Sequence, residues 1–258
     1  MKDFLHAVKA EWITGRRNFL RYSPIVFATI LCIPLFLFIS ERSGRVPPAG
    51  LLLEAVKVCM TGMVYGLPMY CFFIGILSFD NEHKQQQWKH INAQPISGTA
   101  IILAKHFYTW CYVALSPITL LALILVFFFV VKLFQPDLAL GIGNPMIWLT
   151  AIKFWAVCII AGMAIASPLN VMFSRFASYA MTAVPAVFFL FLHFLLAYMI
   201  EETRMLVSIF FPWLNCRIMG QNIYAGTSIK MWWFLPLVAW IAVSLVLNLY
   251  LQKKKPLY

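Results

Sequence analysis

Charged residues are scarce in this sequence. Asp, Glu, Lys and Arg together make up 11% of its 258 residues, whereas hydrophobic residues make up 62%. Soluble globular domains carry about 25% charged residues, so the composition excludes an ordinary soluble domain. Segments of about ten residues that alternate between polar and apolar are also absent, which excludes a transmembrane β-barrel. The composition therefore predicts a bundle of membrane-spanning helices.

Long apolar runs are what the sequence has in place of charge. A bilayer core about 30 Å thick requires roughly 20 apolar residues in each spanning helix. Six segments meet this requirement: 23–40, 58–79, 107–131, 146–172, 178–200 and 231–251. We expect an all-α polytopic membrane protein with six transmembrane helices, folded as a single transmembrane domain over residues 1–258.

Acidic residues are fewer than basic ones, with nine Asp and Glu against twenty Lys and Arg. If the N-terminus is cytoplasmic, the inner segments hold twelve of the basic residues and the outer segments seven, while Lys153 lies within a span. The positive-inside rule then places both termini in the cytoplasm. The net charge of +11 is interpreted as attraction to anionic lipid headgroups, not to nucleic acid.

Three kinds of site motif are missing. The sequence contains no GxxxxGK[ST] phosphate-binding loop and no HExxH zinc motif, so we expect no ATP site, no metal site and no catalytic activity in this chain. The six cysteines show no CxxC or Cys/His ligand spacing and are interpreted as small hydrophobic residues. A disulfide between Cys59 and Cys216 is left open.

Residues 1–22 predict an amphipathic helix at the membrane surface. Apolar side chains fall roughly on one helical face, and Lys, Arg and Glu fall elsewhere. We expect an interfacial elbow helix that leads into the first span, with contact to a partner left open. No small-residue cleavage site follows, so the segment is expected to be retained.

A polar stretch, residues 79–106, separates two of the longest apolar runs. Asp80 is expected to be the N-cap of a helix that Pro95 ends, and Ser97 the N-cap of a helix that continues through Lys105 into the third span. Trp88 and Ile91 give the first helix an apolar edge. From composition, this edge is either a docking surface or part of a solvated loop.

Residues 201–230 form the longest outer segment. It is too polar to span and contains Pro212 and Gly220 as interruptions, so we expect short helices in or at the outer leaflet, or else a solvated loop.

Ionisable residues near the outer membrane surface have two interpretations each. Lys153 either extends its side chain to the headgroups or lines a substrate path, and His193 either bonds a neighbouring helix or lines that path. Glu201 and Glu202 are either solvated or bind a cationic peptide at the outer mouth.

The polar stretch carries a family resemblance. The pattern Phe79, Glu82, Trp88-Lys89, Ile91, Pro95-Ile96-Ser97 and Lys105 resembles the coupling segment of permeases of type-two ABC exporters. Lys9-Ala10-Glu11-Trp12 before the first span is similar to the elbow helix of that family, and the nearest likeness is to small permeases of bacteriocin and lantibiotic immunity transporters. Gln86 and Gly98 depart from the Gly and Arg that the family commonly has there.

The resemblance implies a permease without its own motor. Two permease copies, identical or paralogous, would assemble in the bacterial inner membrane with two cytosolic ABC ATPase subunits, which bind the ATP and Mg²⁺. The resemblance assigns coupling to the ATPase to Asp80, Glu82, Trp88, Lys89, Ile91, Pro95, Ser97 and Lys105, within segment 80–106. The expected substrate is a hydrophobic or amphipathic molecule, either a lantibiotic-like peptide or a lipid, and the alternative function is a channel or sensor subunit without an ATPase.

Overall fold

The computed structural model describes residues 2–16, 19–42, 48–84, 97–134, 144–175, 184, 187–188, 191 and 211–254. Within these residues the chain is helical apart from short connections, and they contain no strand. The predicted all-α class is therefore confirmed for the described part of the chain.

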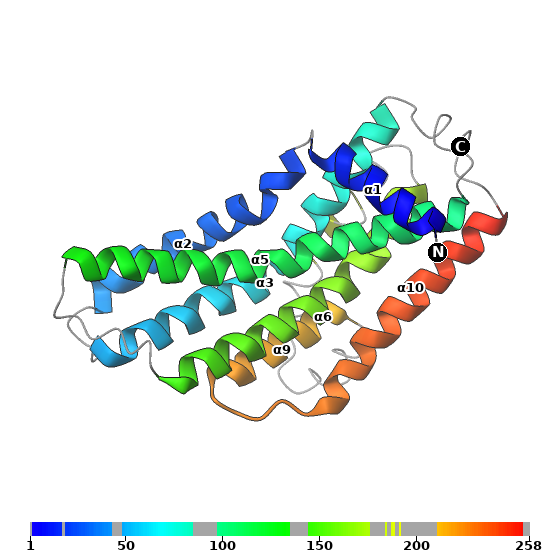
Figure 1. Ribbon diagram of the computed structural model, residues 1–258. Helices are drawn as coiled ribbons and strands as arrows, with labels where there is room; N and C mark the ends of the chain where they lie inside the picture. The colour runs from blue at the N-terminus through cyan, green and yellow to red at the C-terminus, as the bar shows by residue number, and fades with distance from the viewer. Residues whose placement is uncertain are drawn as a thin grey trace.

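The helices differ in length. Long helices are α2 (Ser23–Arg42), α3 (Pro48–Lys84), α5 (Gly98–Phe134), α6 (Pro145–Arg175) and α10 (Phe234–Lys254). Shorter elements are α1 (Lys2–Arg16), η1 (Phe19–Tyr22), α9 (Pro212–Tyr224) and η2 (Met231–Trp233). α6 lies at the centre and packs against α3, α5, α9 and α10, while α2 packs on α5 and α3 (Figure 1).

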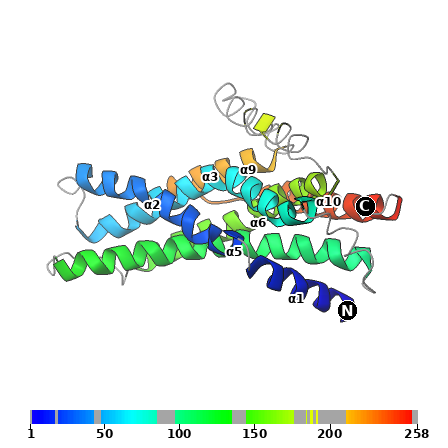
Figure 2. The ribbon, with the colours of Figure 1, turned by 90° about the horizontal axis from the view of Figure 1, so that it is seen from above.

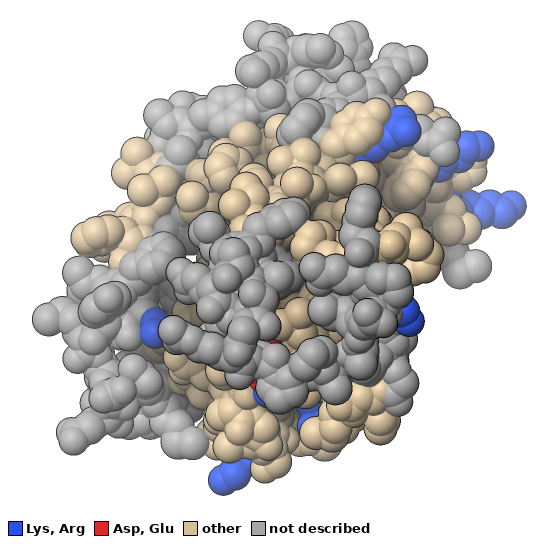
Figure 3. Space-filling model, turned by 90° about the vertical axis from the view of Figure 1, so that its left-hand side faces the viewer, with Lys and Arg blue, Asp and Glu red and all other residues tan. Residues whose placement is uncertain are grey.

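Four described helices are long and apolar enough to cross a membrane: Leu51–Phe79, Gly98–Leu133, Pro145–Arg175 and Met231–Lys253. They correspond to the second, third, fourth and sixth predicted spans. The first predicted span coincides with α2, where Leu20–Ile33 is a shorter apolar stretch. The fifth, residues 178–200, lies outside the described residues except for four positions. On the face seen in Figure 3, most of the described surface is uncharged.

The predicted N-cap at Asp80 is wrong. α3 begins at Pro48, ten residues before the predicted span, and continues through Asp80 to Lys84. The change from apolar to polar residues at position 80 marks the end of the apolar surface, and the backbone stays helical beyond it. Ser97 does cap the next helix as predicted, because the Ala100 N–H donates to Ser97 Oγ at 3.4 Å and to Ser97 O at 2.9 Å.

The interruption predicted at Gly220 in the outer segment is wrong, whereas Pro212 does mark a helix boundary, the start of α9. Pro212 occupies the first turn of α9, where a missing N–H costs nothing, and Gly220 lies inside the helix. A Cβ at Gly220 would come within 3.1 Å of Val64, so the glycine allows α9 to approach α3 closely. The short helix itself was predicted, and one side of it is buried against α3 and α6.

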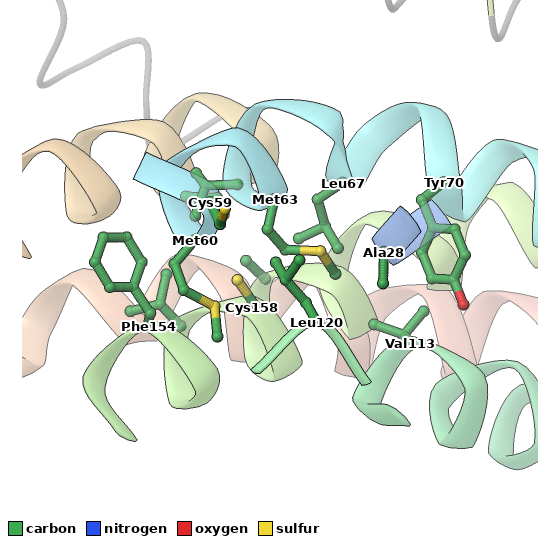
Figure 4. Packing of buried hydrophobic residues seen from close by; sticks show 14 of the residues in the cluster. Ala28, Cys59, Met60, Met63, Leu67, Tyr70, Val113, Leu120, Phe154 and Cys158 are labelled. Carbon is green, nitrogen blue, oxygen red and sulfur yellow. The ribbon is translucent and has the colours of Figure 1, made fainter. Parts of the chain in front are cut away.

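The centre of the bundle is packed with sulfur-containing and aliphatic side chains. Met60 of α3 lies beside Phe154 and Cys158 of α6, and Met63 and Leu67 follow further along α3 in the same cluster (Figure 4). All five are essentially inaccessible to solvent. All six cysteines are free thiols, so the disulfide left open between Cys59 and Cys216 is not formed.

Candidate functional site

One end of the bundle gathers several elements from distant parts of the sequence. α1, the start of α5 and the end of α10 lie at this end, which we call the inner end (Figures 1 and 2). Gly98, the first residue of α5, approaches the side chain of Gln252 near the end of α10 so closely that a Cβ would meet its amide. The arrangement places the predicted elbow helix next to the helix that follows the polar stretch.

A buried ion pair joins α1 to α5. Lys105 Nζ lies 2.9 Å from Glu11 Oε1, and the two side chains are 3% and 15% exposed. The same ammonium group lies 4.9 Å from the ring centre of Phe79 in α3. Three helices therefore meet at one cation. Glu11, Phe79 and Lys105 were all singled out from the sequence, and the structure brings them together.

Aromatic contacts extend this junction along α1. Trp12 meets Tyr108 edge to face with ring centres 6.3 Å apart, and Phe4 meets Phe107 in the same way at 6.0 Å. The Tyr108 hydroxyl is 3.1 Å from that of Tyr112, one turn further along α5. Such edge-to-face pairs each contribute about 0.5–1.5 kcal/mol beyond their buried area. α1 is thus fixed along the first part of α5 by more than one interaction.

Phe79 and Ser97, which flank residues 80–96 of the polar stretch, both lie near the ion pair. Phe79 is the last residue of the apolar part of α3, and Ser97 caps α5 eight residues before Lys105, a rise of about 12 Å. Residues 80–97 therefore connect α3, whose Phe79 lies next to Lys105, to α5, which contains Lys105.

A second polar cluster lies one residue beyond Lys105 and was not predicted. His106 Nε2 lies 3.0 Å from Asn248 Nδ2 of α10, and His106 Nδ1 lies 3.5 Å from Asn170 Nδ2 of α6. Ser174 Oγ donates to Asn248 Oδ1 at 3.3 Å. All four residues are at most 5% exposed. The cluster ties α5, α6 and α10 together at the inner end.

The hydrogen bonds of this cluster follow from what a neutral His106 ring can donate and accept. A neutral ring has one donor and one acceptor, so it cannot accept from two amide NH₂ groups at once. The Asn170 oxygen has no hydrogen-bond partner as placed, which identifies Asn170 as the amide whose orientation does not fit. Exchanging the amide N and O of Asn170 lets its oxygen accept from Nδ1–H while Nε2 accepts from Asn248.

The other predicted site residues have different positions. Lys9 is exposed on α1, and Asp80 and Glu82 belong to the last turns of α3. Lys153 is exposed on α6, and both interpretations of it remain predictions. Outside the described residues lie Trp88, Lys89, Ile91, Pro95, His193, Glu201 and Glu202. Among the residues that are described, no group of three His, Cys, Asp or Glu side chains could hold a metal ion.

The residues that sequence analysis missed carried a signal of their own. His106, Asn170 and Asn248 are polar residues within otherwise apolar helices, and such residues usually bond a neighbouring helix. Lys153 and His193 were examined on this principle.

Comparisons with known proteins give one match. The model of a family described as ABC-2 family transporter protein matches residues 7–194, which is most of the chain and includes the last ten residues of α1, the ion pair and the polar stretch. The search of curated proteins finds no match.

Proposed function

The chain belongs to the ABC-2 family of transporter proteins, and from this premise we propose that it is the permease of an ATP-driven exporter. As a family member it is a multi-pass membrane protein and a permease subunit of an ABC transporter, and the family implies an ABC ATPase partner. The export direction, the contact with the ATPase and the substrate belong to the proposal.

One observation supports the proposal most strongly, the buried pair of Glu11 and Lys105. Taking two charges out of water costs several kcal/mol each, so a pair in this position needs a compensating role. The pair connects α1 to the base of α5 beside the polar stretch. A coupling site requires such a connection, because a movement of the polar stretch must be transmitted to the membrane helices through rigid contacts.

Residues 80–97 are the proposed docking site of the ATPase. Trp88 and Ile91 would be the apolar contacts, with Asp80, Glu82 and Lys89 as the polar rim. α3 continues to Lys84 as an unbroken helix, and α5 starts at Gly98 behind the Ser97 cap. Closure of two ATPase subunits on ATP would therefore move α3 and α5 together, with α1 following through its ion pair.

The proposed assembly has two permease copies in the bacterial inner membrane. Each copy has six spans, with both termini in the cytoplasm and α1 in the inner interface. The position of α1 and of the end of α10 at one end of the bundle agrees with an even number of spans (Figure 1). Movement of the inner ends shifts the population between two packed states, one of which opens outward.

The proposed substrate is hydrophobic or amphipathic, a lantibiotic-like peptide or a lipid. Support comes from the sequence likeness to immunity permeases and from a cavity of about 260 Å³ among α3, α6, α9 and α10. ATP and Mg²⁺ would bind only to the ATPase subunits.

Changing Trp88 and Glu82 together to alanine is expected to abolish recovery of the ATPase with the tagged permease. Both residues lie in the proposed docking segment, and hot-spot aromatic residues often contribute at least 2 kcal/mol, about thirtyfold in affinity. The measurement is copurification from membranes in which both subunits are expressed. Glu54→Gln, which removes the ion pair of Glu54 with Lys57 on α3, is the matched control. Retention of the ATPase by the double variant at the control level would exclude this docking site.

A further inference from the structure

α9 runs antiparallel to α3 and packs along it. The Lys57 Nζ lies 5.7 Å from the ring centre of Tyr224 at the end of α9, and Gln221 Nε2 donates to Tyr65 Oη at 3.2 Å. At the other end, Pro212 and Trp213 line the same cavity as Pro68 and Phe72. Tyr65 is the middle residue of the span Leu51–Phe79. α9 therefore extends from near one end of this span to beyond its centre.

This course places a cation deep in the span. The Arg217 guanidinium carbon lies 5.2 Å from the ring centre of Tyr65. Glu54 and Glu11 form ion pairs with Lys57 and Lys105, and none of the described carboxylates lies within ion-pair distance of Arg217. Ionisable groups at such depth are rare and usually face a cavity or a substrate path.

An apolar cavity begins one helical turn away. Trp213 precedes Arg217 by four residues and Pro68 follows Tyr65 by three, so the cation and the cavity lie along the same seam between α3 and α9. Among the described lining residues, the polar side-chain groups are the Ser244 hydroxyl and the indole N–H groups of Trp213 and Trp240. Because an apolar cavity of 150 Å³ holds benzene, about 260 Å³ accommodates a chain of roughly ten carbons.

We propose that this seam and cavity bind an amphiphile with one anionic head group, a carboxylate or phosphate. Its head lies on Arg217 and its acyl chain fills the cavity. The head group supplies the negative charge that the described residues do not, and a cationic head would be repelled. A peptide chain would leave its amide groups without partners against this lining. The inference rests on the proposed permease function and narrows its substrate class to a lipid-like acid.

Photolabelling tests the proposal on the permease–ATPase complex in nanodiscs. The probes are a dodecanoate with a diazirine in its chain and the dodecanol of the same length carrying the same diazirine. We expect the carboxylate to label peptides containing Trp213 or Trp240 at least fivefold more than the alcohol does. Arg217→Gln is expected to reduce carboxylate labelling to the level of the alcohol. Arg217→Lys should retain most of it, and Lys230→Gln, at an exposed lysine beyond α9, should leave it unchanged.

Equal labelling of the wild-type complex by the two probes would overturn the proposal, whether or not Arg217→Gln folds. Unchanged labelling of a folded Arg217→Gln complex would also overturn it, as would labelling of the cavity by a photoreactive cationic peptide but not by the dodecanoate. In each case, recovery of the ATPase with the permease is measured on the same sample. If the complex keeps its ATPase but fails this test, the proposed substrate class is wrong and the proposed permease function stands.

Discussion

Glu11→Gln is expected to lower the free energy of unfolding by about 3 kcal/mol and to loosen α1 from the bundle. The substitution removes a carboxylate 2.9 Å from a Lys105 ammonium group whose side chain is 3% exposed. Removing one partner of a buried pair typically costs about 3–5 kcal/mol, because the remaining charge stays desolvated. The Phe79 ring 4.9 Å away offsets about 1–2 kcal/mol of this, since a cation–π contact is strongest where the cation is desolvated.

The measurement is equilibrium unfolding in mixed micelles with increasing denaturing detergent. Glu54→Gln is the matched control, because it removes the carboxylate of an ion pair that is 21% and 27% exposed. Pairs of this kind contribute about 0.3–0.5 kcal/mol. A second variant, Glu11→Gln with Lys105→Met, is expected to regain most of the stability, because no buried charge remains. Equal losses in Glu11→Gln and Glu54→Gln would contradict the role given to this pair.

Gly162→Ala is expected to destabilise the bundle by about 1–3 kcal/mol, whereas Gly62→Ala should stabilise it slightly. A Cβ at Gly162 of α6 would overlap Cγ1 of the buried Val113 in α5 and come within 3.4 Å of Leu67 in α3. Overpacking of a filled core typically costs about 1–3 kcal/mol. At Gly62 the nearest atom is Leu31 Cδ2 at 3.6 Å, an ordinary contact, so the helix propensity of alanine gains about 0.5–1 kcal/mol.

The same unfolding measurement separates the two glycines. Both glycines lie inside long helices, so the two substitutions change helix propensity alike. Changes of opposite sign in the free energy of unfolding therefore reflect the difference in packing. Cys71 Sγ also approaches the Gly162 carbonyl at 3.5 Å, which agrees with close contact of α3 and α6 at this position. Stabilisation by Gly162→Ala would show that α3, α5 and α6 do not meet as tightly as described.

Local patterns in the sequence predicted the helices well and their ends less well. Apolar length identified α3, α5, α6 and α10, because a span must bury its backbone polar groups within itself. It failed at Asp80, since the helical backbone does not require apolar side chains and continues through polar residues to Lys84. It also failed at Gly220, which lies inside α9 where this helix packs closely on Val64 of α3.

The residues of the candidate site were predictable from the sequence only through the family resemblance. Lys105 and Glu11 were found through a family resemblance, but their contact depends on α1 folding back along α5, which no local pattern specifies. His106 and Asn248 are 142 positions apart, and their bond follows from helix packing. Arg217 appeared to be an outer-loop cation because the course of α9 along α3 is a tertiary feature.

The most direct test of the account places a photo-crosslinking amino acid at position 88 or at position 232 of the permease in the complex. Trp88 lies in the proposed docking segment, whereas Trp232 is exposed in η2, at the start of the last span. The account predicts a crosslink to the ATPase from position 88 and none from position 232. The account would be contradicted if position 88 gave no crosslink and if a residue at position 88 were modified by a membrane-impermeant reagent added outside intact cells.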